Sequence, residues 1–175
     1  VVHVKRQLYD AYGNDVPANV SLVALDTNNE QTVAVGGVET VREPGMGFGK
    51  VMLDSSEYAW VGGNVRNLIE DVARTDRYPH INNWLLADRY LREVQDQSLY
   101  ELDKGAGMFR QFGRLALFRD VVAPSDSRVR NILENKLVGL AQRANSGTVA
   151  VMIVGSLTGG TGAGQLFINI LPFGN

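Results

Sequence analysis

The chain has 175 residues, enough for one compact α/β domain with its own core, and this length argues against two independent domains. Its 17 Lys and Arg against 19 Asp and Glu give a formal net charge of −2, which offers no broad basic surface for nucleic acid. Because cysteine is absent and no apolar run approaches the roughly 18 to 20 residues of a membrane span, thiol chemistry is excluded and we expect a cytoplasmic protein without a membrane segment.

The first part of the chain predicts a helix, a strand and an irregular stretch. Apolar residues recur at helical spacing from the first residue with no capping residue before them, so we expect the chain to start inside a helix that runs to Gly13. Residues 19–26 then predict a buried strand. Residues 28–63 are rich in glycine and poor in periodicity, and we expect a long irregular excursion there.

Helical periodicity dominates the middle of the chain. It covers residues 65–73, behind Asn64 as a cap, and residues 83–94, and we expect a turn with Pro79 and His80 between these helices. After the glycines at 105 and 107, a further helix is expected to carry four apolar side chains, Phe112, Leu115, Leu117 and Phe118. Beyond Pro124, another helix starts near residues 125–127, and its buried stripe is predicted to be Val129, Leu133, Leu137 and Leu140.

The last part of the chain predicts a central strand. Residues 148–154 are almost wholly apolar and rich in valine, as expected for a parallel strand that is covered on both faces. The strand runs directly into glycines, and Phe167, Ile168 and Ile170 predict a helix that stops at Leu171-Pro172. This order of elements indicates an α/β fold with a parallel sheet flanked by helices, whose ligands bind at the carboxyl ends of the strands.

The strongest chemical signal is the run GSLTGGTGAG at residues 155–164. Glycine permits positive φ and close approach of the backbone to a ligand, a threonine hydroxyl can donate to a phosphate oxygen, and a helix start presents free N–H groups to an anion. We interpret the run as a phosphate-binding loop. It is not a P-loop, because no lysine follows, and the strict dinucleotide fingerprint fails because Gln165 and Phe167 stand where glycine is required.

The same run carries a family resemblance. Residues 158–164 are similar to the tubulin/FtsZ signature, in which a small residue precedes Gly-Gly-Thr-Gly-Ser/Ala-Gly, and Thr158 departs mildly from the usual first residue, which favours a divergent prokaryotic branch. The loop 105–107 resembles the family's Gly-Ala-Gly loop at the terminal phosphate, and the end of the first strand resembles a short FtsZ run near phosphates and magnesium. The resemblance implies a nucleotide-binding set made of Asp26, Thr27, Gly105, Ala106, Gly107, Gly159, Gly160, Thr161, Gly162, Ala163 and Gly164.

The resemblance also implies a fold and a function. Residues 1–175 would be the N-terminal part of a Rossmann-like tubulin/FtsZ nucleotide-binding domain, incomplete in this chain. GTP or GDP with Mg²⁺ would be the cofactors, and the intact protein would associate with itself head to tail into cytoskeletal filaments. GTP hydrolysis would be completed by regions outside the chain, so the catalytic residues are unknown. A non-hydrolysing nucleotide-binding assembly switch and a Rossmann-like NAD-binding oxidoreductase are the alternatives.

A few other side chains have simpler interpretations. His3 and His80 have no second ligand at metal-binding spacing, so no metal site is predicted from them. Arg110 and Arg114 flank the expected phosphate face and could pair with phosphate, although a solvated arginine is the simpler interpretation for each. The two tryptophans are expected to anchor the core or an interface: Trp60 and Trp84.

Overall fold

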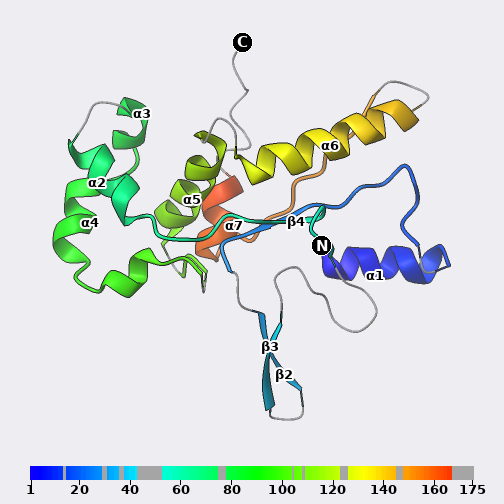
Figure 1. Ribbon diagram of the computed structural model, residues 1–175, viewed down its shortest axis with the longest axis horizontal. Helices are drawn as coiled ribbons and strands as arrows, with labels where there is room; N and C mark the ends of the chain where they lie inside the picture. Colours follow the sequence, from blue (N-terminus) through cyan, green and yellow to red (C-terminus); the bar gives the residue numbers. More distant parts are fainter. Residues whose placement is uncertain are drawn as a thin grey trace.

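A computed structural model gives the arrangement of the chain in space (Figure 1). It describes residues 1–13, 15–28, 31–35, 38–42, 53–74, 78–103, 105–107, 109–122, 126–144 and 148–166. The helices are α1 (Val2–Ala11), α2 (Arg66–Arg74), α3 (Pro79–Asn82), α4 (Ala87–Glu93), the 3-10 helix η1 (Gln97–Tyr100), α5 (Arg110–Val122), α6 (Arg128–Arg143) and α7 (Gly160–Leu166). Within the described residues, no helix combines the length and the apolar character that a membrane crossing requires.

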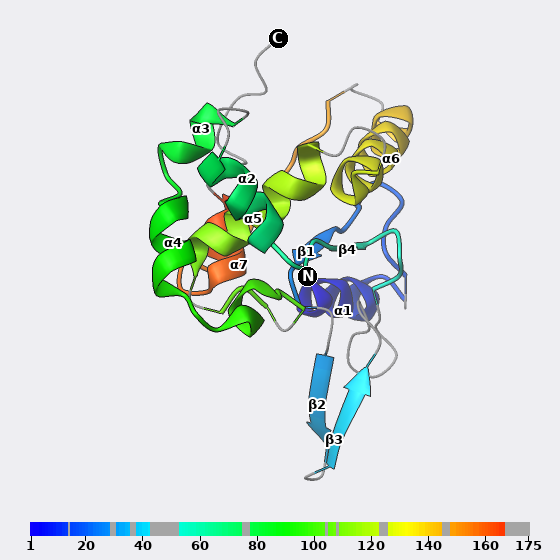
Figure 2. The same cartoon turned by 60° about the vertical axis from the view of Figure 1, so that its left-hand side comes forward.

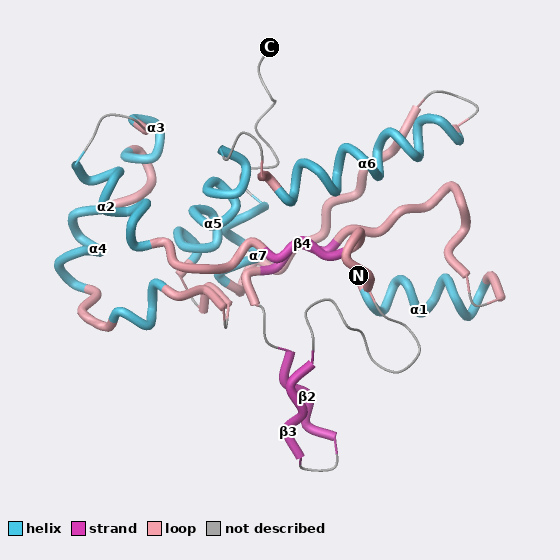
Figure 3. Tube along the Cα trace, in the orientation of Figure 1, coloured by secondary structure: helices cyan, strands magenta, loops and turns pink. Residues whose placement is uncertain are grey.

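The strands form two small sheets, which are coloured magenta in Figure 3. Strand β1 (Ala24–Asp26) pairs in parallel with β4 (Tyr58–Trp60), and β2 (Gln31–Val35) pairs antiparallel with β3 (Val38–Arg42) in a hairpin that projects away from the helices. The predicted strand at 19–26 is therefore shorter than expected. The α/β prediction is compatible with this architecture, but apart from one isolated bridge between Asn64 and Glu101 the described residues contain these two strand pairings and not a full parallel sheet.

The expectation of an irregular excursion over residues 28–63 was wrong for a large part of that stretch. It contains both strands of the hairpin and also β4, the parallel partner of β1. Gln31–Val35 and Val38–Arg42 each contain β-branched residues and flank the Gly36-Gly37 pair, which is a hairpin pattern that the low overall periodicity obscured. Residues 43–52 lie outside the described part of the chain.

The predicted helices around residues 65–94 are confirmed with two changes. Asn64 Oδ1 accepts a hydrogen bond from the Arg66 N–H at 2.8 Å, as expected for a residue that caps α2. The predicted turn at Pro79 and His80 is instead the short helix α3, because proline fits the first turn of a helix, where its missing N–H is not needed. The second predicted helix is limited to α4.

Both helices predicted after residue 107 are present as α5 and α6, and α6 starts close to the predicted residues 125–127. Ser127 caps α6 by accepting a hydrogen bond from the Arg130 N–H at 3.1 Å. The predicted buried stripe of α6 was only partly right, since Val129 is buried but Leu133 and Leu137 are 37% and 39% exposed. The apolar spacing identified the correct helix face, but that face borders an open groove along part of its length.

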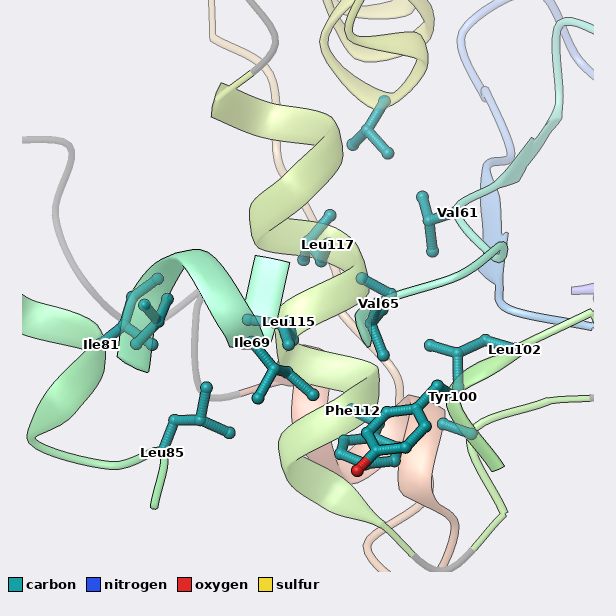
Figure 4. Close-up of a cluster of buried hydrophobic side chains, with 14 of the residues drawn as sticks. Val61, Val65, Ile69, Ile81, Leu85, Tyr100, Leu102, Phe112, Leu115 and Leu117 are labelled. Atoms are coloured by element: carbon teal, nitrogen blue, oxygen red, sulfur yellow. The ribbon is translucent and has the colours of Figure 1, made fainter. Parts of the chain in front are cut away.

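The core lies between α2, α5 and the segments that connect them. Figure 4 shows Ile69 of α2 and three side chains of α5 pointing into one apolar cluster, which also receives Val65 and the ring of Tyr100. The rings of Tyr100 and Phe112 stack with their centroids 5.6 Å apart. The α5 members of this cluster are Phe112, Leu115 and Leu117. Burial of this cluster is the main favourable term for folding, and it fixes α5 as the central helix.

The predicted central strand at residues 148–154 was wrong. This segment makes no strand pairing with any described residue, and its Met152 and Val154 are 88% and 86% exposed. It borders a groove of about 350 Å³ whose other walls come from α6 and from residues 21–25 at β1. An apolar run predicts burial, but a strand also needs a neighbour that pairs with its N–H and C=O groups, and no described strand pairs with this segment.

Candidate phosphate-binding site

Three segments that are far apart in the sequence meet at the end of β1. Thr27 follows β1 directly and is fully buried, and its hydroxyl accepts a hydrogen bond from the Ala106 N–H at 3.0 Å. The same oxygen lies 2.6 Å from the hydroxyl oxygen of Thr161 in α7. The Gly160 N–H also donates to the Gly107 carbonyl at 2.8 Å. The structure thus brings together the three segments that the sequence singled out, the strand end, the loop 105–107 and the glycine run.

The loop 105–107 depends on glycine for its backbone conformation. Gly105 has φ +98° and Gly107 has φ +53°, values that place both residues in the left-handed region. Side chains other than glycine are penalised there because Cβ crowds the neighbouring carbonyl. Between them, Ala106 is buried and its N–H is held by Thr27.

The glycines of the run 159–164 have a different role. The sequence interpretation invoked positive φ for them, but in the structure none of these glycines has a left-handed φ. A Cβ on Gly160 would lie 2.5 Å from the Gly107 carbonyl oxygen, and one on Gly162 would lie 2.8 Å from the Ser156 backbone nitrogen. A Cβ on Gly164 would lie 2.6 Å from the Arg114 nitrogen. These glycines therefore allow close backbone contact among α5, α7 and the loops.

Some of the backbone N–H groups in these loops are occupied and others are open. Gly160 donates to Gly107, and Ala163 donates to the Gly159 carbonyl at 3.1 Å within the first turn of α7. The N–H groups of Gly107, Thr161 and Gly162 have no hydrogen-bond acceptor among the described residues. Gly107 is exposed, and the other two are half-buried. The arrangement can therefore present three amides to an anion, fewer than the run of glycines alone had indicated.

Residues 1–171 match the family model described as "Tubulin like". The chain belongs to the tubulin-like family. Neither the search of curated proteins nor the search of solved structures returned a match. The tubulin/FtsZ resemblance of the glycine run is thereby confirmed at the level of the family.

Asp26 of this tubulin-like chain sits beside the strand end. Its Oδ1 accepts a hydrogen bond from the Asn28 N–H at 3.2 Å, which is the geometry of an Asx turn. Tyr58 donates its hydroxyl to the Asn28 carbonyl at 2.7 Å, and burial together with the negative charge of Asp26 raises the pKa of Tyr58 to about 12. Within the described residues, no three His, Cys, Asp or Glu side chains gather as a metal site would require.

The two arginines near the tubulin-like loops differ in their surroundings. The guanidinium of Arg114 lies over the Trp84 ring, with its central carbon 4.3 Å from the ring centroid, and burial lowers the pKa of Arg114. Arg114 is thus placed by a cation–π contact. Arg110, one turn earlier in α5, is exposed. His80 packs edge-on against the Phe118 ring at 5.4 Å between centroids, and His3 is exposed on α1.

Two residues that support the site were not predicted from the sequence as parts of it. Trp60 donates its ring N–H to the Thr27 carbonyl at 2.9 Å, which ties β4 to the end of β1. Gly113 lies in the middle of α5, where a Cβ would lie 2.9 Å from the Gly160 carbonyl carbon. A glycine inside an otherwise regular helix is the signal that could have identified this crossing, since glycine there is unfavourable unless packing requires it.

Proposed function

We propose that this chain binds the phosphates of a guanine nucleotide, GTP or GDP, between the loop 105–107 and residues 159–164. The observation that supports this proposal is the hydrogen-bonded convergence of these two loops at Thr27 in a chain of the tubulin-like family. The open amides of Gly107, Thr161 and Gly162 are the donors that we assign to phosphate oxygens. The other residues of the two loops hold the backbone in the conformation that positions these amides.

The proposal also includes Mg²⁺ as a second cofactor, for which the residues of the site offer few ligands. Magnesium in nucleotide sites commonly takes one or two protein carboxylates and completes its coordination with phosphates and water. Asp26 is the only carboxylate in the assigned set, and the Asx turn holds it at the strand end. Asp26 therefore suits a magnesium ion that is held mainly through the phosphates of the nucleotide. When bound, the ion supplies positive charge that offsets the charge of the phosphates.

The proposal extends to assembly of the intact protein. In a head-to-tail contact two different surfaces meet, and repetition of such a contact produces open filaments unless the geometry closes. We propose that the face made by the two loops is one of these surfaces and that nucleotide lies within the contact. Hydrolysis of GTP would then be completed by regions outside this chain. The alternative is a protein that binds the nucleotide and assembles without hydrolysing it. An assay of phosphate release distinguishes the two.

Competition binding on the 175-residue chain tests the nucleotide proposal. A fluorescent GDP analogue serves as the probe, and GDP, guanosine, ATP and NADH serve as competitors. We expect guanosine to compete at least about tenfold less well than GDP, because it lacks the phosphates that make charge-assisted hydrogen bonds. ATP should also compete less well, because it carries the wrong base. Equal competition by guanosine would refute phosphate recognition, and preferential competition by NADH would favour the oxidoreductase alternative.

A further inference from the structure

Among the polar side chains of the predicted set, Asp26, Thr27 and Thr161, only Thr27 is fully buried. Its hydroxyl oxygen joins two loops at once, through the Ala106 N–H at 3.0 Å and the Thr161 hydroxyl at 2.6 Å. Its own carbonyl accepts from the Trp60 ring at 2.9 Å, which fixes the backbone from the other side. A side chain enclosed in this way is not free to reach a nucleotide directly.

The direction of the hydrogen bond between the two threonines follows from this burial. A hydroxyl group has one hydrogen and two acceptor lone pairs, and the Thr27 oxygen already accepts from Ala106. Its hydrogen is enclosed away from bulk solvent, and the acceptor placed for it among the described residues is the Thr161 oxygen. An unpaired buried donor is costly, whereas a half-buried hydroxyl can turn toward solvent or a ligand. Thr27 is therefore the donor and Thr161 the acceptor.

This direction has a consequence for Thr161. Because Thr161 accepts from Thr27, its own hydroxyl hydrogen is not used in this bond. Thr161 is half-buried, and its backbone N–H and that of Gly162 have no acceptor within the described residues. The hydroxyl hydrogen and these two amides are thus three donors without a partner in the described part of the chain, and they belong to two consecutive residues, an arrangement that suits an anionic oxygen.

We infer that Thr27 is a positioning residue, which donates to the Thr161 hydroxyl so that Thr161 presents its hydrogen to a phosphate, and which holds the loop 105–107 in register through Ala106. The inference deepens the proposed function and rests on it for the phosphate. Thr27 itself does not touch the nucleotide. Loss of its hydroxyl affects both loops, because both are bonded to the same oxygen atom.

Amide hydrogen exchange tests the structural half of the inference without any nucleotide. Thr27→Val keeps the shape of the side chain but removes the hydroxyl, whereas Thr27→Ser keeps the hydroxyl. In the 175-residue chain, we expect exchange of the Ala106 N–H to become at least about tenfold faster in Thr27→Val and to stay near the wild-type rate in Thr27→Ser. An unchanged Ala106 rate in a folded Thr27→Val variant would overturn the inference. If Thr27→Val does not fold, Thr161→Val must leave the Ala106 rate near wild type, because the Ala106 bond does not involve Thr161.

Affinity for GDP, with inorganic pyrophosphate as a second probe, tests the phosphate half. We expect Thr27→Val and Thr161→Val each to weaken GDP about tenfold, with Thr27→Ser near wild type. The double variant should be weaker than either single variant by no more than about twofold, because both substitutions remove the same donor arrangement. Independent, multiplying effects would overturn the positioning role. A wild-type chain that binds neither GDP nor pyrophosphate would overturn the proposed function and this half of the inference, while the exchange experiment still decides the link between Thr27 and Ala106.

Discussion

Lys5 of α1 and Glu57, just before β4, form a buried ion pair with 2.6 Å between Nζ and Oε2. The same carboxylate oxygen accepts a hydrogen bond from the Asp54 N–H at 3.1 Å. Figure 2 shows α1 lying alongside the segment that leads to β4. The pair therefore connects the first helix to the strand that completes the parallel sheet, and it does so inside the protein, where an uncompensated charge is expensive.

Lys5→Met should destabilise the fold strongly. The substitution leaves the Glu57 carboxylate buried without its cation, and breaking a buried pair in this way costs about 3 to 5 kcal/mol of unfolding free energy. Urea unfolding followed by circular dichroism measures the loss. Lys136→Met is the control, because Lys136 donates to the exposed Ser56 hydroxyl at 2.9 Å and forms no buried ion pair in the part of the chain that the structure describes, and we expect a change within about 0.5 kcal/mol there. Equal effects of the two substitutions would contradict a structural role for the buried pair.

Gly113→Ala should destabilise the protein, although alanine is the better helix former. The new Cβ would lie 2.9 Å from the Gly160 carbonyl carbon, so α5 and α7 would have to separate, at about 1 to 3 kcal/mol. Gly139→Ala in α6 is the matched control, since its Cβ meets only the flexible Arg143 side chain at 3.6 Å, and it should stabilise by about 0.5 to 1 kcal/mol. Chemical unfolding measures the change in unfolding free energy of each variant, and we expect the two changes to have opposite signs. A stabilising Gly113→Ala would show that the helices are not in close contact.

The sequence predicted the helices and the loops well because their signals are local. Asn64 caps the helix that it was expected to cap, and Ser127 caps a helix that was expected to start near it. A helix follows the glycine run as predicted, although α7 already begins inside the run, at Gly160. The family itself was predictable from residues 158–164, since the family match covers them. The roles of the individual loop residues toward nucleotide stay predictions.

What could not be predicted depends on partners distant in the sequence. Residues 148–154 have the composition of a buried strand, but pairing needs a neighbour that no local pattern specifies. Thr27 was expected at the end of a strand. Its burial, however, depends on Ala106 and Thr161, which lie 79 and 134 positions later in the chain. The role of the glycines in α7 likewise depends on α5, the helix that crosses them. From the sequence alone, the same glycines could be required either by a positive φ or by close packing of the backbone.

Alkaline pH should weaken the fold through Tyr58. The pKa of Tyr58 is raised from its ordinary value of 10.0 to about 12 by burial and by Asp26, so the folded state holds the phenol proton more tightly than the unfolded state does. This contribution to stability is complete below pH 10 and is lost as the pH rises toward 12, and it amounts to roughly 2 kcal/mol. Tyr58→Phe removes the group, so urea unfolding at pH 9 and 11.5 should show a smaller pH effect in the variant. An equal pH dependence of the unfolding free energy in the two proteins would mean that the Tyr58 phenol is exposed to solvent.

Gly107→Val should weaken GDP binding while preserving the fold. Gly107 is exposed with φ +53°, and a Cβ there meets nothing within 4 Å, so valine strains the loop by about 1 to 3 kcal/mol without a clash. A shifted loop moves the open amide away from the proposed phosphate. Gly13→Val is the matched control, with φ +74° and equally open surroundings at the end of α1. GDP titration should show a weaker affinity for Gly107→Val than for Gly13→Val. Equal affinities of the two variants would mean that Gly107 is not part of the site.

The intact protein should assemble into filaments when GTP is bound. If nucleotide lies within a head-to-tail contact, GTP with Mg²⁺ should increase light scattering and produce filaments by negative-stain microscopy, because a contact between two different surfaces repeats without limit. GDP in place of GTP should weaken the effect. Gly107→Val should also weaken it, whereas Gly13→Val should not, since both carry the same backbone strain but only Gly107 belongs to the proposed face. The 175-residue chain alone should stay small under the same conditions. An intact protein that binds GTP and remains monomeric over a wide concentration range would refute the filament proposal and leave nucleotide binding standing, and phosphate release measured on the same samples then shows whether the bound GTP is hydrolysed.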